Sequence, residues 1–443
     1  MRDLALAAVL VLLLAMAVAR PFVGVLVWSW ISFMNPHREA FGFAQTQPWA
    51  MMAFLATILG CFLAREPKKF APTPIAMLLV VLGLCFTLTS FAALAPPEAV
   101  WAKWDGIIKM LVGLVLTSLL LTDRWRIHAM IWLIVISLGY FGVKGGIFTL
   151  MTGGAFIVVG PPDSMIGDRN HLAVALLFAI PLMNYLRQQS SHPIVRWGLV
   201  LGMASTLMAV VGSQSRGALI GLAATAGVLW LRSPGKIVSG IAIVAALAAA
   251  VAFMPDSWVE RMNTIQDYNA DASAMGRITI WRVAIQLALM RPLTGGGFLG
   301  MYFQHIVNQI DPAVEARATH SIWLEVLGEH GFPTFFVWVA VLLAGVLASL
   351  RIVRLANGRP DLRWAYDLAR MAQVSIVAYC IGGSFLSLSY WDCFWTLMVV
   401  LGATQALVVA AVREEGPRRR NATSASWSGG ARAAPAGRQA AAP

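Results

Sequence analysis

Apolar runs long enough to cross a bilayer recur along most of the chain. A helix needs roughly 17–25 apolar residues to span the hydrocarbon core. A proline break at Arg20-Pro21 leaves open whether the first run is one kinked helix or two short ones. If it crosses once, the pattern predicts an all-α integral membrane protein with about twelve transmembrane helices, at about 4–34, 48–64, 72–95, 104–121, 126–150, 169–187, 194–212, 217–232, 236–254, 332–350, 366–389 and 393–412.

The charged residues lie mostly between these runs and divide the connections into two alternating sets. Loops rich in positive charge stay in the cytoplasm, so the strict alternation places both termini there. The formal net charge of +12 therefore reflects topology and does not indicate a nucleic-acid partner. The basic set comprises Arg65, Lys68, Lys69, Arg124, Arg126, Arg187, Arg196, Arg232, Lys236, Arg351, Arg354, Arg359, Arg363 and Arg370.

This topology divides the chain into four regions. Residues 1–254 hold the first nine or ten crossings, and residues 332–412 hold the last ones. Between them, residues 255–331 form one large loop on the outer side, far longer than an ordinary connection and therefore expected to be functional. Residues 413–443 end in a stretch rich in Ala, Gly, Ser and Arg, which predicts a disordered cytoplasmic tail.

The large loop contains an apolar pattern of its own. Ile278, Trp281, Ile285 and Ala288 recur at helical spacing. They predict an amphipathic helix from residue 275 to 290 that lies on the membrane surface. A second short helix is expected at residues 321–327.

Arginine is enriched on the predicted outer side, where topology alone would deplete positive charge. Its planar fork binds phosphate oxygens in a bidentate way that lysine does not reproduce. The enrichment favours an anionic, phosphate-bearing ligand, although pairing with acids of the same loop is an alternative. That alternative is weakest for Arg216, which has no acid nearby in sequence. The outer basic residues are Arg38, Lys103, Arg169, Arg216, Arg261, Arg277, Arg282, Arg291 and Arg317.

Candidates for acid–base chemistry are few. His320 stands just before a short helix, where a neutral imidazole could accept a proton from an attacking hydroxyl. A lone histidine is more often structural, so this role stays open at the level of the residues alone. The outer loops lack an Asp-x-Asp pair or a compact metal-ligand cluster, and the chain has no P-loop and no GxSxG elbow. We expect no metal and no cofactor.

Five motifs follow one another on the predicted outer side. In this order they resemble the O-antigen ligase and polymerase superfamily of bacteria. The segment from Arg20 to His37 is similar to the branch of O-glycosylation ligases, so the resemblance covers nearly the whole chain except the tail. The motifs are Asp168-Arg169-Asn170-His171-Leu172-Ala173, Ser215-Arg216-Gly217, Arg277 to Trp281 as R-x-x-x-W, Arg291-Pro292-Leu293-Thr294-Gly295-Gly296-Gly297, and His320 to Glu325 with Gly328 to Pro333.

The resemblance implies a GT-C-like glycosyltransferase architecture in the bacterial inner membrane, with an active site that faces the periplasm. It implies catalytic roles for Arg216, Arg277 and His320. The expected reaction is a metal-independent, inverting-type transfer of a glycan from undecaprenyl pyrophosphate, with membrane lipids around both substrates. To these we add candidate substrate-binding residues, which are Arg169, Asn170, Arg282, Arg291 and Asp392.

The acceptor is not distinguished by these motifs. The leading interpretation is an O-antigen ligase that transfers undecaprenyl pyrophosphate-linked O-antigen to lipid A–core. A protein O-oligosaccharyltransferase and an O-antigen polymerase use the same chemistry with other acceptors. A lipid or polysaccharide transporter without chemistry is the alternative from another class. Paired broken helices would favour it, and the sequence shows no such pairing.

Overall fold

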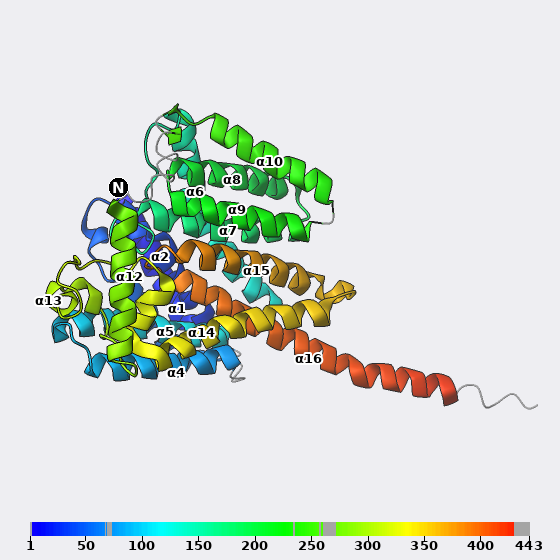
Figure 1. Ribbon diagram of the computed structural model, residues 1–443. Helices are drawn as coiled ribbons and strands as arrows, with labels where there is room; N and C mark the ends of the chain where they lie inside the picture. The colour runs from blue at the N-terminus through cyan, green and yellow to red at the C-terminus, as the bar shows by residue number, and fades with distance from the viewer. Residues whose placement is uncertain are drawn as a thin grey trace, which may run out of the picture.

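The protein is a bundle of helices in the computed structural model, which describes residues 2–66, 68, 73–233, 235–256, 258–259 and 272–428 (Figure 1). The described part contains no strands. Its helices are α1 (Arg2–Ala19), α2 (Pro21–Met34), η1 (Pro36–Glu39), η2 (Phe43–Gln45), α3 (Trp49–Leu63), α4 (Pro74–Phe91), α5 (Pro97–Leu120), α6 (Arg124–Met151), α7 (Arg169–Gln189), α8 (Pro193–Gly212), α9 (Arg216–Arg232), α10 (Lys236–Ala252), α12 (Ala272–Met290), η4 (Gly300–Tyr302), α13 (Gln304–Val307), α14 (Ile322–Ala356), η5 (Pro360–Leu362), α15 (Arg363–Gly383) and α16 (Asp392–Ser428).

The connections between the long helices gather at two ends of the bundle. One end, called the loop end below, carries α12 and α13 (Figure 1). The other end, called the basic end, contains the arginine- and lysine-rich connections that the sequence analysis placed together on the cytoplasmic side. There Arg126 pairs with Glu66 at 2.5 Å, and the Arg370 guanidinium donates to the carbonyl of Arg232 at 2.5 Å. Loops far apart in sequence therefore share an end as their charge pattern predicts; which side of a membrane each end faces stays a prediction.

Six helices in the described part are long and apolar enough to cross a membrane. Three further apolar helices, α2, α3 and α10, are shorter than a full span. A multi-pass membrane protein follows from this composition, while the number of twelve crossings stays a prediction. The six are α1, α4, α6, α8, α14 and residues 392–414 of α16.

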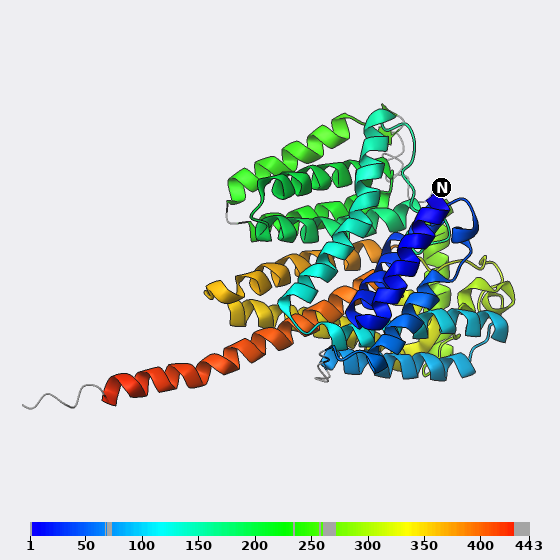
Figure 2. The ribbon, with the colours of Figure 1, turned by 180° about the vertical axis from the view of Figure 1, so that it is seen from behind.

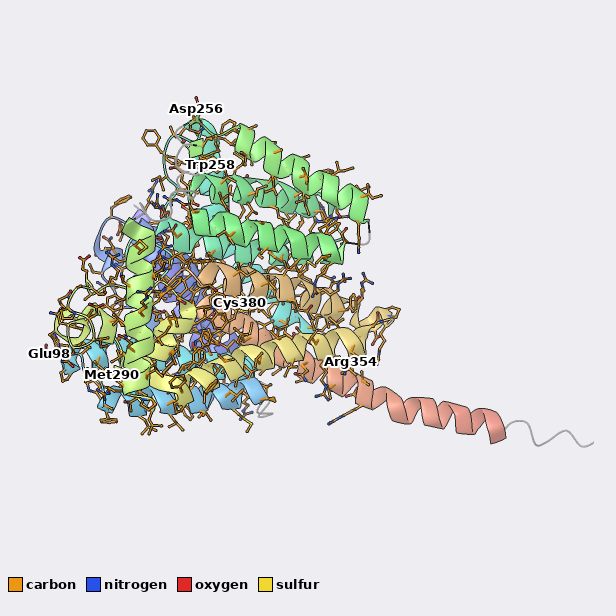
Figure 3. The ribbon with its side chains drawn as sticks, viewed as in Figure 1. Glu98, Asp256, Trp258, Met290, Arg354 and Cys380 are labelled. Atoms are coloured by element: carbon orange, nitrogen blue, oxygen red, sulfur yellow. The ribbon has the colours of Figure 1, made fainter. Side chains whose placement is uncertain are left out.

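The first apolar run is two helices, one of the two possibilities that the sequence left open. Arg20 adopts an extended conformation (φ −136°, ψ 90°) and Pro21 starts α2, so the chain reverses. Asp3 accepts hydrogen bonds from the backbone of Gly42 and Ala44, which brings the start of α1 beside the segment that follows α2. The N-terminus therefore lies at the loop end, whereas α16 leaves the bundle at the basic end (Figures 1 and 2). This arrangement favours termini on opposite sides, and the expectation that both are cytoplasmic stays a prediction.

Close contacts between small residues hold the central helices together. A Cβ added at Gly146 of α6 would overlap the backbone of Ser205 in α8, and one at Gly142 would overlap Thr206. Such small surfaces let membrane helices approach closely without the hydrophobic drive available in water. On α7, residues 172–179 are all at most 1% exposed, which makes this helix the centre of the bundle. Its first turn at the loop end is thereby fixed in place.

The predicted short helix at 321–327 and the following crossing are one element with a break. α14 contains Gly331 in a left-handed conformation (φ 70°), and the Phe332 amide donates to the Pro292 carbonyl at 2.8 Å. The amides of Gly296 and Gly297 donate to the carbonyls of Gly328 and Glu329, at 2.9 and 2.7 Å. A side chain at Gly331 would strain this junction, because its Cβ would lie 2.5 Å from the Pro292 carbonyl. The glycine turn and the end of the short helix therefore interlock.

The helix predicted in the large loop is present as α12, and its buried face overlaps only in part with the predicted positions, of which Ala288 is fully buried. Ile280, Ala284 and Leu287 are at most 3% exposed and pack on the rest of the loop, whereas Ile285 is 41% exposed. The apolar side chains of α12 lie on all sides of the helix, so their spacing alone did not identify the buried side. Figure 1 shows α12 running across the loop end of the bundle.

The C-terminal helix is longer than expected. α16 continues to Ser428, so residues 413–428 of the predicted disordered tail are helical. Residues 429–443 and much of the segment between α10 and α12 lie outside the described residues, among them Arg261.

Candidate active site

His320 occupies a strained and tightly held position at the loop end, immediately before α14. Its φ of 51° is left-handed, which is costly for a residue with a side chain and is typical of functional sites. The His320 amide donates to Ser387 Oγ at 3.0 Å. The preceding carbonyl, of Thr319, accepts from Trp281 Nε1 of α12 at 2.7 Å. Two distant elements thus fix the backbone on both sides of the imidazole.

The imidazole of His320 lies among charged groups from three parts of the chain. Burial, with smaller contributions from Arg277, His171 and Arg317, lowers the pKa of His320 to about 4, against the opposing effect of Asp168. The ring is therefore neutral at neutral pH. Its Nδ1 is buried and has no hydrogen-bond partner in the described part of the protein. A buried nitrogen without a partner costs free energy unless a ligand satisfies it.

The start of α7 contributes the second element of this cluster. Asp168 accepts from the Asn170 amide at 2.8 Å, from Asn170 Nδ2 at 2.9 Å and from His171 Nδ1 at 3.3 Å. These hydrogen bonds, with that of His171 the largest, hold the pKa of Asp168 well below its usual range against the opposing effect of burial. Asp168 therefore caps α7, orients His171 and places Arg169 on the first helical turn.

Arg277 and Arg216 approach the same end from α12 and α9. A Cβ added at Gly276 would overlap the Arg317 guanidinium, so that arginine lies against the backbone next to Arg277. Arg216 follows the N-cap Ser215, whose hydroxyl accepts from the Ala218 amide at 3.2 Å. A Cβ at Gly217 would lie 3.8 Å from Phe385, two residues before the Ser387 that binds His320. The motifs of α7, α9, α12 and α14 therefore converge.

Three of the predicted binding residues are not brought into this cluster by any contact. The Arg291 guanidinium donates to the Ala92 carbonyl at 2.5 Å and so caps the end of α4. Asp392 is buried and accepts from Ser32 Oγ and from the Cys393 amide, which ties α16 to α2. Arg282 is exposed on α12. We assign structural roles to Arg291 and Asp392.

Sequence reasoning missed a buried polar network beside the cluster. Glu329 accepts from Lys103 at 3.2 Å, from Tyr390 at 2.5 Å and from the Leu299 amide at 2.8 Å. His330 is bonded at both nitrogens, to Thr89 at 2.7 Å and to Tyr390 at 3.0 Å. The only signal for it was that Glu329 and His330 belong to one of the quoted motifs.

Positioning partners of His320 were also missed. Trp281 and His171 stood inside quoted motifs without an assigned role, and Ser387 and Thr319 carried no signal at all. Within the described residues, no group of three His, Cys, Asp or Glu side chains is arranged to hold a metal ion. The site is thus an arginine-rich cluster around the neutral imidazole of His320.

Two family models match this chain. Residues 1–191 match a family of unknown function, and residues 201–339 match the family described as O-Antigen ligase. No curated protein matches the chain. The second match contains Arg216 at the start of α9, Arg277 on α12 and His320 just before α14. Residues 201–339 of this chain, which contain all three predicted catalytic residues, are therefore similar to the O-antigen ligase family.

Proposed function

We propose that the protein is a membrane glycosyltransferase that moves a glycan from a polyprenyl pyrophosphate, undecaprenyl pyrophosphate in bacteria, to an acceptor hydroxyl on the outer face of the inner membrane. The observation that carries this proposal is the buried, unpartnered Nδ1 of His320 amid the charges of Arg277 and Arg317. An imidazole with a free nitrogen beside arginines suits a reaction that removes a proton and releases an anion.

The reaction forms one bond and breaks one. The acceptor oxygen attacks C1 of the sugar, the bond from C1 to the phosphate oxygen breaks, and its electron pair leaves with the pyrophosphate. Arginines stabilise the charge that develops on the leaving group. The acceptor proton passes to His320 and from there to solvent or to the released pyrophosphate. The activated donor supplies the driving force, so the step needs neither ATP nor a metal.

The charges around His320 make it sensitive to the donor. In the free protein Arg277 and Arg317 contribute to its low pKa, and an imidazole with a pKa of about 4 is a weak base. A bound pyrophosphate would neutralise those arginines and bring negative charge near the ring, which raises the pKa. His320 then becomes a stronger base only when donor is present. Arg169, Asn170 and Arg282 remain proposed donor contacts.

The acceptor separates the leading function from its alternatives. Transfer by purified protein from a lipid-linked donor should be tested with lipid A–core, with a protein acceptor and with the lipid-linked glycan itself. We expect lipid A–core to accept the glycan, in excess chelator as well as without it. Transfer only to protein would make the chain an oligosaccharyltransferase, and chain growth only on the donor would make it a polymerase. No transfer to any acceptor, with lipid movement instead, would favour a transporter.

A further inference from the structure

The unpartnered buried nitrogens of the described chain lie in two places. One is His320 Nδ1, and the others are His37 Nδ1 and Arg38 Nε, two neighbouring residues of η1. The remaining unpartnered side-chain atoms are hydroxyls of Ser29 and Ser137 within helices. A second place at the loop end therefore offers nitrogen donors to a ligand.

The two residues that carry these nitrogens, His37 and Arg38, line a cavity of about 670 Å³, a volume in the range of small-molecule sites. Trp28, Phe54 and Met110 form an apolar part of its lining, from α2, α3 and α5. His37, Arg38 and Lys109 form a polar, cationic part. An apolar wall that meets a cationic rim suits an amphiphile with an anionic headgroup.

The acids near this rim leave it positive. Arg38 pairs with Asp163 at 3.5 Å, but the Asp163 side chain is 77% exposed, so water and salt screen the pair. Lys109 pairs with Asp105 one turn earlier on α5. Glu39 is engaged by Lys144 at 2.7 Å on the wall of a different cavity. The Arg38 guanidinium thus has only a weak acidic partner, and its Nε has no hydrogen-bond partner in the described structure.

The segment around the cavity is also suited to the membrane boundary. Phe41 and Phe43 lie between the residues that line it and are 84% and 50% exposed. Exposed aromatic side chains beside cationic ones are typical of the interface between headgroups and hydrocarbon. A lipid could therefore enter the cavity from the bilayer, with its headgroup at the level of Arg38.

We propose that this cavity, lined by His37, Arg38 and Lys109, is a second lipid site that binds a phosphate-bearing lipid through its headgroup. It is separate from the arginines around His320 and lies within residues 1–191, whose matching family has no known function. Ser32 on its wall donates to Asp392, and Asp392 follows Ser387, the partner of His320, by five residues. Five residues span at most roughly 18 Å, which a few sugar rings can bridge.

A role follows for the bound lipid, and this step rests on the proposed function. Transfer between two amphiphiles needs two membrane-level sites that face one reacting centre. With the donor pyrophosphate at Arg216 and Arg277, the cavity would hold the acceptor. A phosphate-selective lipid site favours a phosphorylated lipid acceptor over a protein.

The test measures lipid binding to the full-length protein by native mass spectrometry in nonionic detergent. The probes are dioleoyl phosphatidic acid, dioleoylglycerol, which lacks the phosphate, and inorganic phosphate. Arg38→Gln removes the guanidinium, and Gly106→Leu fills the cavity, since a Cβ at Gly106 meets no atom within 4 Å. The matched controls are Lys144→Gln on the other cavity and Gly198→Leu at an equally open glycine of α8.

We expect phosphatidic acid to bind. Arg38→Gln should weaken its binding about tenfold, the loss of one charge-assisted contact, and Gly106→Leu should weaken it by a similar factor because it occupies the cavity. The controls and Arg277→Ala should stay within about twofold of the unmodified chain. Equal binding by all variants, equal binding of dioleoylglycerol, or equal affinity for inorganic phosphate would overturn the lipid site. In transfer assays Arg38→Gln should raise the acceptor KM and leave the donor KM unchanged. Binding without any transfer would reject the proposed function and keep the lipid site.

Discussion

Two histidines at the loop end differ in how completely the protein satisfies them. His330 is fully buried, its two nitrogens are bonded to Thr89 and Tyr390, and Phe86 and Phe298 pack on its ring with centroids 4.6 and 4.4 Å away. His320 is only partly buried, is held through its backbone and leaves Nδ1 without a partner in the described structure. A saturated polar network stabilises one fold, whereas an open buried nitrogen is available to a ligand. We therefore expect His330 to stabilise the fold and His320 to take part in the reaction, although both belong to the same sequence motif.

The largest expected effects are a loss of stability on replacing His330 and a loss of transfer activity on replacing His320. His330→Ala removes the hydrogen bonds to Thr89 and Tyr390 and opens a cavity, so it should lower the free energy of unfolding by about 2–4 kcal/mol. His320→Ala should leave thermal unfolding nearly unchanged and abolish most transfer. Thermal unfolding in detergent and steady-state transfer, measured on the same preparations, check this pair. Similar melting losses for both variants would erase the distinction.

A second comparison contrasts two arginines near opposite ends of α12. Arg277 lies near its start, and Arg291 directly follows its last residue, Met290. Arg277 contributes to the charge around His320, while Arg291 caps α4 through the Ala92 carbonyl. Lysine keeps the charge and loses the planar fork, so Arg277→Lys should lower kcat/KM by more than about tenfold. Arg291→Lys should change kcat/KM by less than about threefold and act on stability. Equal losses of kcat/KM for the two variants would instead support a role of Arg291 in substrate binding.

Much of this arrangement could be predicted from the sequence. The alternation of charged loops predicted which connections share an end, and local patterns predicted α12 and the start of α14. The contacts that build the site were beyond such reasoning, because they join residues far apart in the chain. Trp281 reaches Thr319 across 38 positions, and Arg291 reaches Ala92 across 199.

The errors have physical causes as well. A charged residue in an outer motif looks like a ligand-binding group until its partner is known, and a backbone carbonyl gives no sequence signal. The partner of Asp392, Ser32, lies in the distant first apolar run, and the role of Asp392 in substrate binding stays a prediction. The sequence left that run open as one kinked helix or two short ones because its hydrophobicity is continuous across Pro21. The structure has a pair of helices, which pack closely where Ala17 meets Gly24.

A smaller effect is expected at Trp281, as a positioning residue. Trp281→Phe removes the hydrogen bond to Thr319 and loosens the left-handed backbone at His320, at a cost of roughly 1 kcal/mol, or about fivefold in kcat. The donor KM should change less than kcat. Trp230→Phe is the matched control, because its indole nitrogen also donates to a carbonyl, that of Lys236, at the basic end. A role in packing alone would lower stability without this split between kcat and KM.

The smallest expected effect is a shift in the pH profile. The acidic limb of kcat/KM reports the free protein, so it should fall near pH 4, the low pKa that burial and Arg277 give His320. The acidic limb of kcat reports the donor complex and should lie at higher pH, because bound pyrophosphate raises the pKa of His320. As pH falls through each pKa the imidazole gains a proton and transfer declines. If the acidic limbs of kcat and kcat/KM fell at the same pH, donor binding would not change the pKa of His320.

Single-turnover transfer with saturating lipid-linked donor tests most directly whether His320 acts on the acceptor proton. General-base assistance is worth about 10²–10⁴ in rate. The chemical step of His320→Ala should therefore slow by about that factor, while the donor Kd stays within about threefold of the unmodified protein. A chemical step at the unmodified rate, or a loss explained entirely by weaker donor binding, would contradict the assignment of His320 as the base.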